Sequence, residues 1–573
     1  MDNKIWEFVS QDEGLKLHLA RKLEISPFLA SLLINRGVHD FAAANAFLYP
    51  DWKNLSDPFY LPGMEEAVLR IKEALQKKER ILIYGDYDAD GVLATALLAL
   101  FFRRLGVSVE TYLPHRLGEG YGLHFSPLYA AKKRGVDLVI SVDCGTASGS
   151  VVKKASEIGL DIIITDHHLI TEEVPEKVPL VNPHLGWKEN LKSLSGVGVA
   201  FQLVRAISIL MARKGLIPFA EETNSEYLDL VATGSIADLS PLWGESRTFV
   251  CLGLKVLRRA ERPAFRALFD QAGLMNPNLQ VDLETISYII GPRINAAGRV
   301  SSADLSLQLF LSENEKERQE FAKRLEENNR QRQSMEKKIL EEALGEIEEK
   351  NLAEKPVIIL KKSSWHPGVV GIVAGKISER FHRPTIIFAV NPHLAKGSGR
   401  STPNFNLFEA VKSCRKFLSN FGGHQKAVGV SILPANLEDF QRAMEDYAEK
   451  KFKVEDFQER IKVESLFDLS ELTPGVAKEV GMMAPFGEGN PAPVLASLGL
   501  EVQKYSKIFG NNHLKLWLRK GRTFRQAIGY GMAHLQPFLP AGLMVDVAYT
   551  PHLSTEEEVS RIELEIKSLR ESV

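Results

Sequence analysis

Hydrophobic and polar positions follow two alternating patterns through the first half of the chain. Short apolar runs predict strands at 81–84, 107–113, 137–142, 161–165 and 178–182. Apolar residues at helical spacing predict helices between and after these strands, at 92–105, 126–134, 148–158, 197–213 and 226–238. Strands that alternate with helices are typical of βαβ units, so we expect an α/β fold with a mostly parallel sheet.

The pattern differs in the rest of the chain. Residues 1–50 carry helical spacing and predict an N-terminal helical segment. Residues 313–351 are rich in charged and amide side chains with only a thin apolar stripe, which predicts a long, solvated connecting helix and a domain boundary. Residues 352–455 return to α/β patterning with glycine-rich turns, and 456–573 alternate with period two, which favours a small antiparallel barrel or sandwich.

Length and composition are those of a multi-domain globular protein. The 573 residues allow three or four domains at about 150 residues each. The longest apolar stretch, 92–102, is too short to cross a bilayer, and the N-terminus lacks a signal-peptide pattern. The three scattered cysteines have no metal-ligand spacing and predict reduced thiols. We therefore expect a cytoplasmic protein without membrane association.

A formal net charge of −2 hides a local basic stretch. Between Glu501 and Arg525 a single acid stands against seven cations, Lys504, Lys507, Lys515, Arg519, Lys520, Arg522 and Arg525. Four aromatic residues are interleaved with them, Tyr505, Phe509, Trp517 and Phe524. Cations that track phosphates, together with rings that stack on unpaired bases, are typical of single-strand binding. Some of these rings must fill the barrel, and Trp517 fits a core position as well as a stacking platform.

Carboxylates and imidazoles gather where the predicted strands end. Asp86, Asp88 and Asp90 follow strand 81–84. The strand 137–142 is followed by one acid, and the strand 161–165 by an acid and two histidines, Asp143, Asp166, His167 and His168. Because parallel strands bring their carboxyl ends to one edge of a sheet, these side chains are expected to meet there. Asp238, in a later helix or turn, is a candidate closing ligand.

Mixed carboxylate and imidazole ligands without thiolate suit Mn²⁺ or Mg²⁺ better than zinc. Two such ions about 3.5–4 Å apart would activate a water and neutralise the leaving oxygen of a phosphoester. Asp143 is our choice for the bridging carboxylate that this spacing needs. Simpler explanations exist: Asp-x-Asp-Gly is usually a turn, a His-His pair is usually structural, and Asp143 could cap the next helix. Since all three arise at successive strand ends, we prefer a metal site.

Together, these motifs resemble the DHH phosphoesterase superfamily. Its four motifs are matched in order by Asp88-x-Asp90-Gly91, Asp143, Asp166-His167-His168 and Asp238. Further segments at 293–299, 365–371, 397–401 and 422–424 make the chain similar to the RecJ family of bacterial single-strand-specific DNA exonucleases, over nearly its full length.

The resemblance implies a division of the ligands between two ions. Asp88 would bind one ion, Asp143 would bridge, and the other ion would be bound by Asp90, His167 and Asp238. Many superfamily members place a metal-binding histidine where this chain has Tyr84, a poor ligand. Asp86 or water is therefore expected to complete the shell of the first ion.

Two further residues at this edge are expected to act without binding metal. His168 would donate a hydrogen bond to a phosphate oxygen. Asp166 would orient the two histidines from behind.

The resemblance also implies a set of substrate-binding residues, Arg116, Arg299, His366, Ser398, Arg400, Gly423, His424 and Trp517. The loop 365–375 opens a helix whose backbone N–H groups could hold an anion, and 397–401 offers flexible backbone, hydroxyls and a guanidinium for a terminal phosphate. The glycines at 422–423 would permit close backbone approach. Structural alternatives stay open: glycine turns mostly serve folding, Arg116 could be a surface residue, Arg299 could anchor domain packing, and His366 could hold its loop.

By this resemblance the domains are a DHH catalytic domain at 51–312, a DHHA1-type substrate-binding domain at 352–455 and an oligonucleotide-binding (OB) fold-like barrel at 456–573. The implied activity is metal-dependent 5′-to-3′ hydrolysis of single-stranded DNA to mononucleotides in repair and recombination. A channel too narrow for a duplex would select single strands. Implied partners are a single-stranded-DNA-binding protein and a repair helicase, with the enzyme as a monomer.

Three alternatives remain open from the sequence. A small-substrate DHH phosphodiesterase would act on short oligonucleotides or cyclic dinucleotides, although the basic barrel argues against it. A non-catalytic replication factor would lack ligands that are present here. A structural scaffold with incidental metal would bind ions without hydrolysis.

Overall fold

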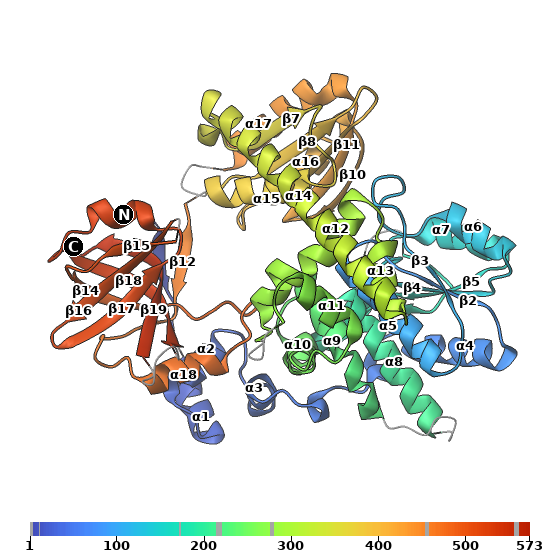
Figure 1. Cartoon of the computed structure of the whole chain (residues 1–573), viewed down its shortest axis with the longest axis horizontal. Coiled ribbons are helices and arrows are strands. Elements are labelled where there is room, and N and C mark those ends of the chain that lie inside the picture. Colours follow the sequence, from blue (N-terminus) through green and yellow to red (C-terminus); the bar gives the residue numbers. More distant parts are fainter. Residues whose placement is uncertain are drawn as a thin grey trace. The chain divides into compact units, whose positions relative to one another are not determined.

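The computed structural model describes residues 4–10, 12–170, 174–213, 221–275, 280–452, 458–510, 512–554 and 561–572 (Figure 1). The chain forms two compact units. One combines Met1–Asp51 with Gln458–Val573, and the other is Trp52–Phe457, which is therefore inserted into the first along the chain. Within the described part of the chain, every helix is too short or too polar to span a membrane.

A parallel five-stranded sheet forms the first half of the larger unit, as the sequence predicts. Its strand order is β3 (Glu110–Tyr112), β2 (Ile81–Tyr84), β4 (Leu138–Val142), β5 (Asp161–Thr165) and β6 (Leu180–Val181). The strands predicted at 81–84 and 161–165 match residue for residue. Those predicted at 107–113 and 178–182 are shorter, because only their central residues pair.

Helices cover both faces of this sheet. On one face, α4 (Met64–Lys77), α5 (Ala89–Arg104), α8 (Gly196–Arg213) and α9 (Leu228–Ala237) share a core with Ile81, Ile83 and Ile140. On the other face, α6 (Phe125–Lys133) and α7 (Gly149–Glu157) pack on Leu82, Val139 and Ile162. Alternate strand residues thus enter opposite cores, which explains why these strands are apolar throughout.

The sheet domain is completed by α10 (Gly244–Leu257), α11 (Pro263–Gln271), α12 (Gly291–Val300) and α13 (Asp304–Leu311). The long helix α14 (Glu315–Glu349) then runs to the next domain (Figure 1), which confirms the predicted connecting helix. Its thin apolar stripe enters two cores: Ala322 and Leu325 join the first domain, whereas Ile339, Ala343 and Ile347 join the second. The helix is therefore packed at both ends rather than only solvated.

The second domain of this unit is a mixed sheet. Its strand order is β10 (Leu418–His424), β11 (Ala427–Ile432), β9 (Ala395–Arg400), β8 (Thr385–Val390) and β7 (Ile358–Lys362), and only β7 and β8 pair in parallel. The flanking helices are α15 (Val370–Phe381), α16 (Leu407–Ser413) and α17 (Leu437–Lys451).

Our interpretation of 397–401 and 422–424 as glycine-rich turns with flexible backbone was wrong. Most of these residues lie inside β9 and β10 and are fixed by strand pairing. Glycine is used here for room: a Cβ on Gly397 would lie 2.5 Å from the ring of Phe388.

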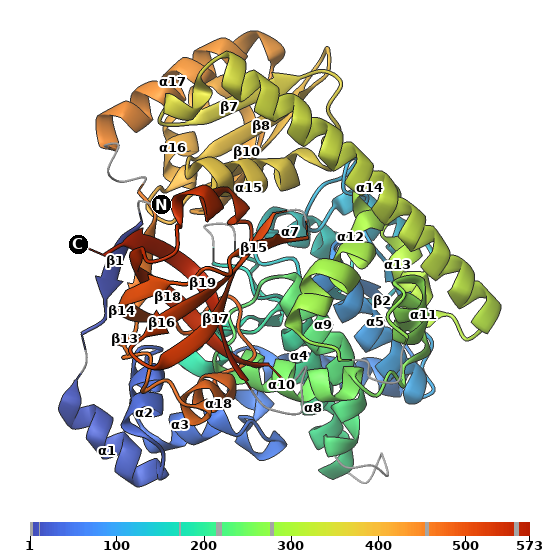
Figure 2. The same ribbon diagram turned by 60° about the vertical axis from the view of Figure 1, so that its left-hand side comes forward.

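In the smaller unit, five strands close into a barrel (Figure 2). They are β14 (Leu495–Val502), β18 (Met544–Ser554), β19 (Arg561–Glu571), β17 (Thr523–Gly529) and β16 (His513–Lys520), and a β14–β16 pairing closes the ring. The short strands β13 (Ser465–Leu466) and β15 (Lys507–Phe509) extend it, and α18 (Pro474–Met482) packs on β18. The structure thus selects a barrel over a sandwich.

The expectation that aromatic rings of the basic stretch fill this barrel was wrong. Leu514, Leu516 and Leu518 of β16 point into the core, so Trp517 lies on the outer face between them. Tyr505 and Phe524 are exposed. Period two explains the outcome, because residues on odd and even positions of a strand face opposite sides.

The N-terminal segment is helical as predicted, with α1 (Glu13–Leu23), α2 (Pro27–Ile34) and α3 (Phe41–Leu48). One strand was missed: β1 (Ile5–Phe8) pairs in parallel with β12 (Arg460–Val463). Buried Trp6 of β1 donates from Nε1 to Ser568 Oγ at 2.7 Å, and the Arg570 guanidinium lies 4.1 Å from its ring centroid. Four residues are too few for a periodic pattern, which is why the sequence did not reveal it.

We expect Trp6→Ala to destabilise the smaller unit by about 3 kcal/mol, the usual cost of deleting a buried aromatic ring. Amide hydrogen exchange of β18 and β19 in the full chain should accelerate. Trp187→Ala is the matched control, because that ring is 73% exposed in the other unit. Unchanged exchange in the Trp6 variant would show that the N-terminal strand contributes nothing to the barrel.

Candidate metal centre

The carboxyl ends of β2, β4 and β5, together with the end of α9, bring all six predicted ligands to one edge of the parallel sheet. Asp86, Asp88 and Asp143 place one ligand atom each within 4.8 Å of one another. The same holds for Asp90, His167 and Asp238. A third group, Asp143 with His167 and His168, links the two. Their roles as ligands stay a prediction, but the geometry has the two-site form that the sequence implies.

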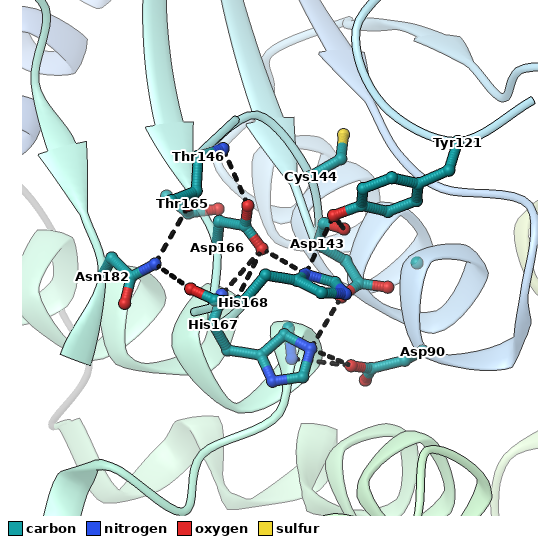
Figure 3. Close-up of polar contacts among 12 residues, drawn as sticks. Asp90, Tyr121, Asp143, Cys144, Thr146, Thr165, Asp166, His167, His168 and Asn182 are labelled. Atoms are coloured by element: carbon teal, nitrogen blue, oxygen red, sulfur yellow. Dashed lines mark hydrogen bonds and ion pairs between the residues drawn. The ribbon is translucent and has the colours of Figure 1, made fainter. Parts of the chain in front are cut away.

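His167 belongs to two of these groups and points toward Asp90 and Asp143 (Figure 3). Its Nε2 is 3.2 Å from Asp143 Oδ1, 3.9 Å from Asp90 Oδ2 and 4.0 Å from Asp238 Oδ2. The backbone holds two of the carboxylates in place. Asp88 Oδ1 accepts from the N–H groups of Asp90 and Gly91 at the start of α5, and the two Asp90 oxygens accept from Gly196 and Val197 at the start of α8.

Asp143 does not cap the following helix, which excludes that alternative explanation. Ser148 precedes α7 instead, and Asp143 adopts a left-handed backbone conformation with φ of 61°. Such a conformation costs about 1 kcal/mol or more for a residue with a Cβ, and it is typical of functional sites. Tyr84 is turned away from the ligands, since its hydroxyl donates to the carbonyl of Gly122 at 3.3 Å. Asp86 stands in the ligand group in its place.

The electrostatic environment of this edge favours bound cations. Burial, and then repulsion from neighbouring aspartates, raises the pKa of Asp86, Asp90 and Asp143 well above the usual range. Burial lowers the pKa of His167, so its ring is neutral and able to bind metal. Asp86 Oδ1, Asp143 Oδ1 and His167 Nε2 are buried without a hydrogen-bond partner among the described residues. Hard oxygens and one imidazole in this arrangement fit Mn²⁺ or Mg²⁺.

Asp166 and His168 form a pair behind the ligands. Asp166 Oδ1 lies 2.8 Å from His168 Nδ1 and also accepts from the backbone N–H of His167, while its Oδ2 accepts from Thr146. Burial raises the pKa of Asp166, but the hydrogen bond and charge of His168 outweigh it and lower that pKa below the usual range. In return, the hydrogen bond and charge of Asp166 outweigh the burial of His168 and raise the pKa of His168 to about 9.

Two residues that the sequence did not suggest complete this pair (Figure 3). The Tyr121 hydroxyl lies 2.9 Å from His168 Nδ1, and the Asn182 amide donates to the His168 carbonyl at 2.9 Å and to Thr146 Oγ1 at 3.0 Å. Tyr121 follows Arg116 in a glycine-rich segment, and Asn182 follows the last strand. Neither carries a spacing signal to His168, because the contact depends on the tertiary fold.

Arginines gather beside the metal edge. Arg299 is half-buried. Its burial, and then the charges of Arg116 and Arg400, lower its pKa to about 9. Burial and Arg116 likewise lower the pKa of Arg400. The Arg116 guanidinium lies 4.8 Å from the ring centroid of Tyr87, beside Asp86 and Asp88. Like charges that lower one another's pKa make a favourable place for an anion.

The other predicted substrate residues differ in what the structure shows of them. Arg299 also donates to the carbonyl of Gly368 at 3.1 Å, which supports its alternative role in domain packing. His366 Nδ1 accepts from the Gly368 N–H at 3.2 Å, which supports its alternative role in holding the loop. The charges of Arg400, His168 and Asp238 act on the His424 ring. Ser398 and Gly423 lie in β9 and β10. Trp517 belongs to the other unit.

Comparison with known proteins agrees with this fold. Residues 80–235 match the family described as DHH family, N-terminal domain, residues 354–450 the DHHA1 domain, and residues 463–568 the RecJ OB domain. The parallel sheet with its acidic edge is thus a DHH domain, and the following sheet and barrel are the domains that accompany it. This confirms the fold class expected from the sequence.

Proteins that are similar over most of the chain identify the family within this class. The chain is 36% identical over 546 residues to the single-stranded-DNA-specific exonuclease RecJ of Bacillus subtilis, covering 95% of this chain and 68% of that protein. It is 32% identical to RecJ of Escherichia coli, with 86% of each chain covered. The crystal structure of Thermus thermophilus RecJ with Mn²⁺ matches with a TM-score of 0.84 and 29% identity, over 99% of this chain and 80% of that chain. The chain belongs to the RecJ family of single-stranded-DNA-specific exonucleases.

Proposed function

We propose that this protein is a two-metal phosphodiesterase that removes mononucleotides from the 5′ end of single-stranded DNA. The observation that carries the proposal is the pair of ligand groups at one sheet edge, next to a cluster of half-buried arginines. Family membership supports the substrate, and the 5′ polarity rests on the likeness of the motifs.

The two ligand groups would hold one divalent ion each. Asp86, Asp88 and Asp143 would surround the first, and Asp90, His167 and Asp238 the second, with Asp143 shared. Mn²⁺ and Mg²⁺ are the candidates, because RecJ of Thermus thermophilus has been solved with each. Bound here, such ions supply activation of a water and charge neutralisation at the leaving oxygen.

The chain's own residues hold and orient the substrate. Asp166 engages His168 through Nδ1, which leaves Nε2 to donate a hydrogen bond to a non-bridging phosphate oxygen. Tyr121 and Asn182 fix the position of this histidine. Arg116, Arg299 and Arg400 would bind the terminal phosphate, where a buried anion relieves their mutual repulsion.

The barrel supplies a surface for unpaired bases. Register places Trp517 opposite Gln526, and Arg519 opposite Phe524, on the outer face of β16 and β17. Lys507 and Lys515 pair on the same side. Cations and rings are thus interleaved on one face, as a sequence-tolerant strand-binding surface requires.

We expect Trp517→Ala to weaken binding of a long single strand by roughly 5- to 100-fold, since one stacked base contributes about 1–3 kcal/mol. Turnover of a short oligonucleotide should change far less. Phe538→Ala, an exposed ring outside the basic stretch, is the control. Fluorescence anisotropy at fixed salt measures both variants, and equal affinities would remove Trp517 from the proposed surface.

We also propose a setting for this activity. The free thiols Cys144, Cys251 and Cys414 suit the reducing cytoplasm. An enzyme that accepts only unpaired strands needs a helicase to supply them, and it meets a single-stranded-DNA-binding protein on its substrate. DNA repair and recombination generate such strands, and we expect the enzyme to act as a monomer.

End-labelled DNA tests the proposal. With Mn²⁺, a 5′-labelled single strand should release labelled mononucleotide from the first turnover, whereas a 3′ label should remain on long products until late. A blunt duplex should resist. Preference for a dinucleotide over a long strand would instead indicate a small-substrate phosphodiesterase, and metal binding without hydrolysis would indicate a scaffold.

A further inference from the structure

We infer that helix α12 is a rigid spacer that sets which phosphodiester bond lies at the metal edge, and that Asn295 and Gly298 are its positioning residues. The inference rests on the proposed function, because it concerns the length of the released product. Its basis is that α12 contacts the metal-binding loop and the arginine cluster within two turns of helix.

One side of α12 is fixed to the loop that carries the aspartates. Asn295 Oδ1 accepts from the backbone N–H of Ala89 at 2.8 Å, and Ala89 stands between Asp88 and Asp90. Gly298 touches the same loop: a Cβ at this position would lie 2.6 Å from the carbonyl oxygen of Tyr87. Only glycine permits so close an approach, so the distance between helix and loop has little freedom.

The next residue along α12 reaches the substrate side. Arg299 belongs to the arginine cluster, and its guanidinium donates to the carbonyl of Gly368 at 3.1 Å. A Cβ on Gly368 would lie 2.4 Å from the carbonyl oxygen of Arg299, so the loop 365–369 is also pressed against the end of the helix. The anchor for the terminal phosphate is therefore fixed to α12 by side chain and backbone alike.

Between these contacts the helix is held in place. Ile294, Ala296 and Ala297 are buried, and Ser306 Oγ donates to the Ile294 carbonyl at 2.8 Å. The four residue steps from Asn295 to Arg299 rise about 6 Å along the axis, and a packed helix does not stretch. A strand whose terminal phosphate is held by Arg299 thus presents its bonds to the aspartates at a fixed offset. This geometry explains release of one nucleotide per cut.

The substitution Gly298→Ala tests the spacer. Its methyl group must push α12 and the loop 86–90 apart by a few tenths of an ångström or more. A displacement of about 1 Å can cost about 100-fold in rate, so mononucleotide release should fall steeply. The preference for a 5′ phosphate over a 5′ hydroxyl should fall with it. The rate of release and the 5′-phosphate preference are both measured on a labelled single strand with a 5′ phosphate and on the same strand with a 5′ hydroxyl.

Two further variants keep the result interpretable. Asn295→Ala removes the hydrogen bond to Ala89 without adding volume, and should show the same loss of 5′-phosphate preference even if Gly298→Ala fails to fold. Gly345→Ala is the matched control, because no described atom lies within 4 Å of the added methyl group in α14. It should leave the product pattern unchanged.

If both variants cleave more slowly but keep the 5′-phosphate preference, the spacer is overturned. A wild-type enzyme that releases its label first from the 3′ end would contradict the proposed function itself. The two failures are thus separate.

Discussion

Asp143→Ala is expected to reduce hydrolysis of single-stranded DNA at least about 1000-fold, because loss of a shared ligand removes several kcal/mol of transition-state stabilisation. Asp143 is the predicted ligand closest to His167, and it connects the two ligand groups. Strand binding should persist in large part, since the arginine cluster and the barrel surface are untouched. Measurement requires a turnover assay with Mn²⁺ and a binding assay on the same preparation.

Asp270→Asn is the control for this experiment, because Asp270 is an exposed carboxylate on α11 of the same unit. It should retain full turnover. Undiminished nuclease activity in the Asp143 variant would end the assignment of this edge as the catalytic centre. Parallel loss of binding and turnover would indicate a folding defect instead, which a melting curve detects.

Without metal, the protein is expected to lose stability as pH rises. The folded-state pKa values of Asp86, Asp90 and Asp143 are raised, so the folded chain holds protons that the unfolded chain releases at about pH 3.9, the ordinary pKa of an aspartate. Their contribution is complete below that pH and is lost as pH rises through the folded pKa values. His168, with its pKa raised to about 9, adds a loss between about pH 6.5 and 9. His167 acts in the opposite direction near pH 6.5.

Mn²⁺ should reverse this trend, because it binds the deprotonated ligands and stabilises the folded state more as pH rises. A tenfold difference in proton affinity between the folded and unfolded states corresponds to about 1.4 kcal/mol, so the melting temperature in chelator should fall by at least about 2 °C between about pH 5 and 9. Differential scanning calorimetry with chelator and with Mn²⁺ checks both slopes. Identical slopes in the two conditions would contradict a metal site at this edge. Asp143→Asn should flatten the chelator curve.

The fold was predicted best from the sequence for elements that are buried on both sides. The strands at 81–84 and 161–165 lie between two helical layers, so they read as unbroken apolar runs with clear ends. Most of the predicted ligands follow from the same fact, because they stand just after such a strand. Asp238 follows a helix instead, and the family motif supported it as the candidate closing ligand.

Prediction from the sequence failed at residue types that serve more than one structural purpose. Glycine usually marks a turn, but in β9 it makes room for Phe388. Trp517 is apolar, but alternation with three buried leucines places it outside the barrel. Tyr121 and Asn182 were missed because their contacts with His168 arise only after folding. β1 was too short to show any period.

The most direct test of the central claim is to locate manganese in crystals by anomalous diffraction. We predict two peaks about 3.5–4 Å apart, with Asp143 between them. Asp86 and Asp88 should contact one ion, and Asp90, His167 and Asp238 the other. A single peak, or peaks away from these side chains, would contradict the account.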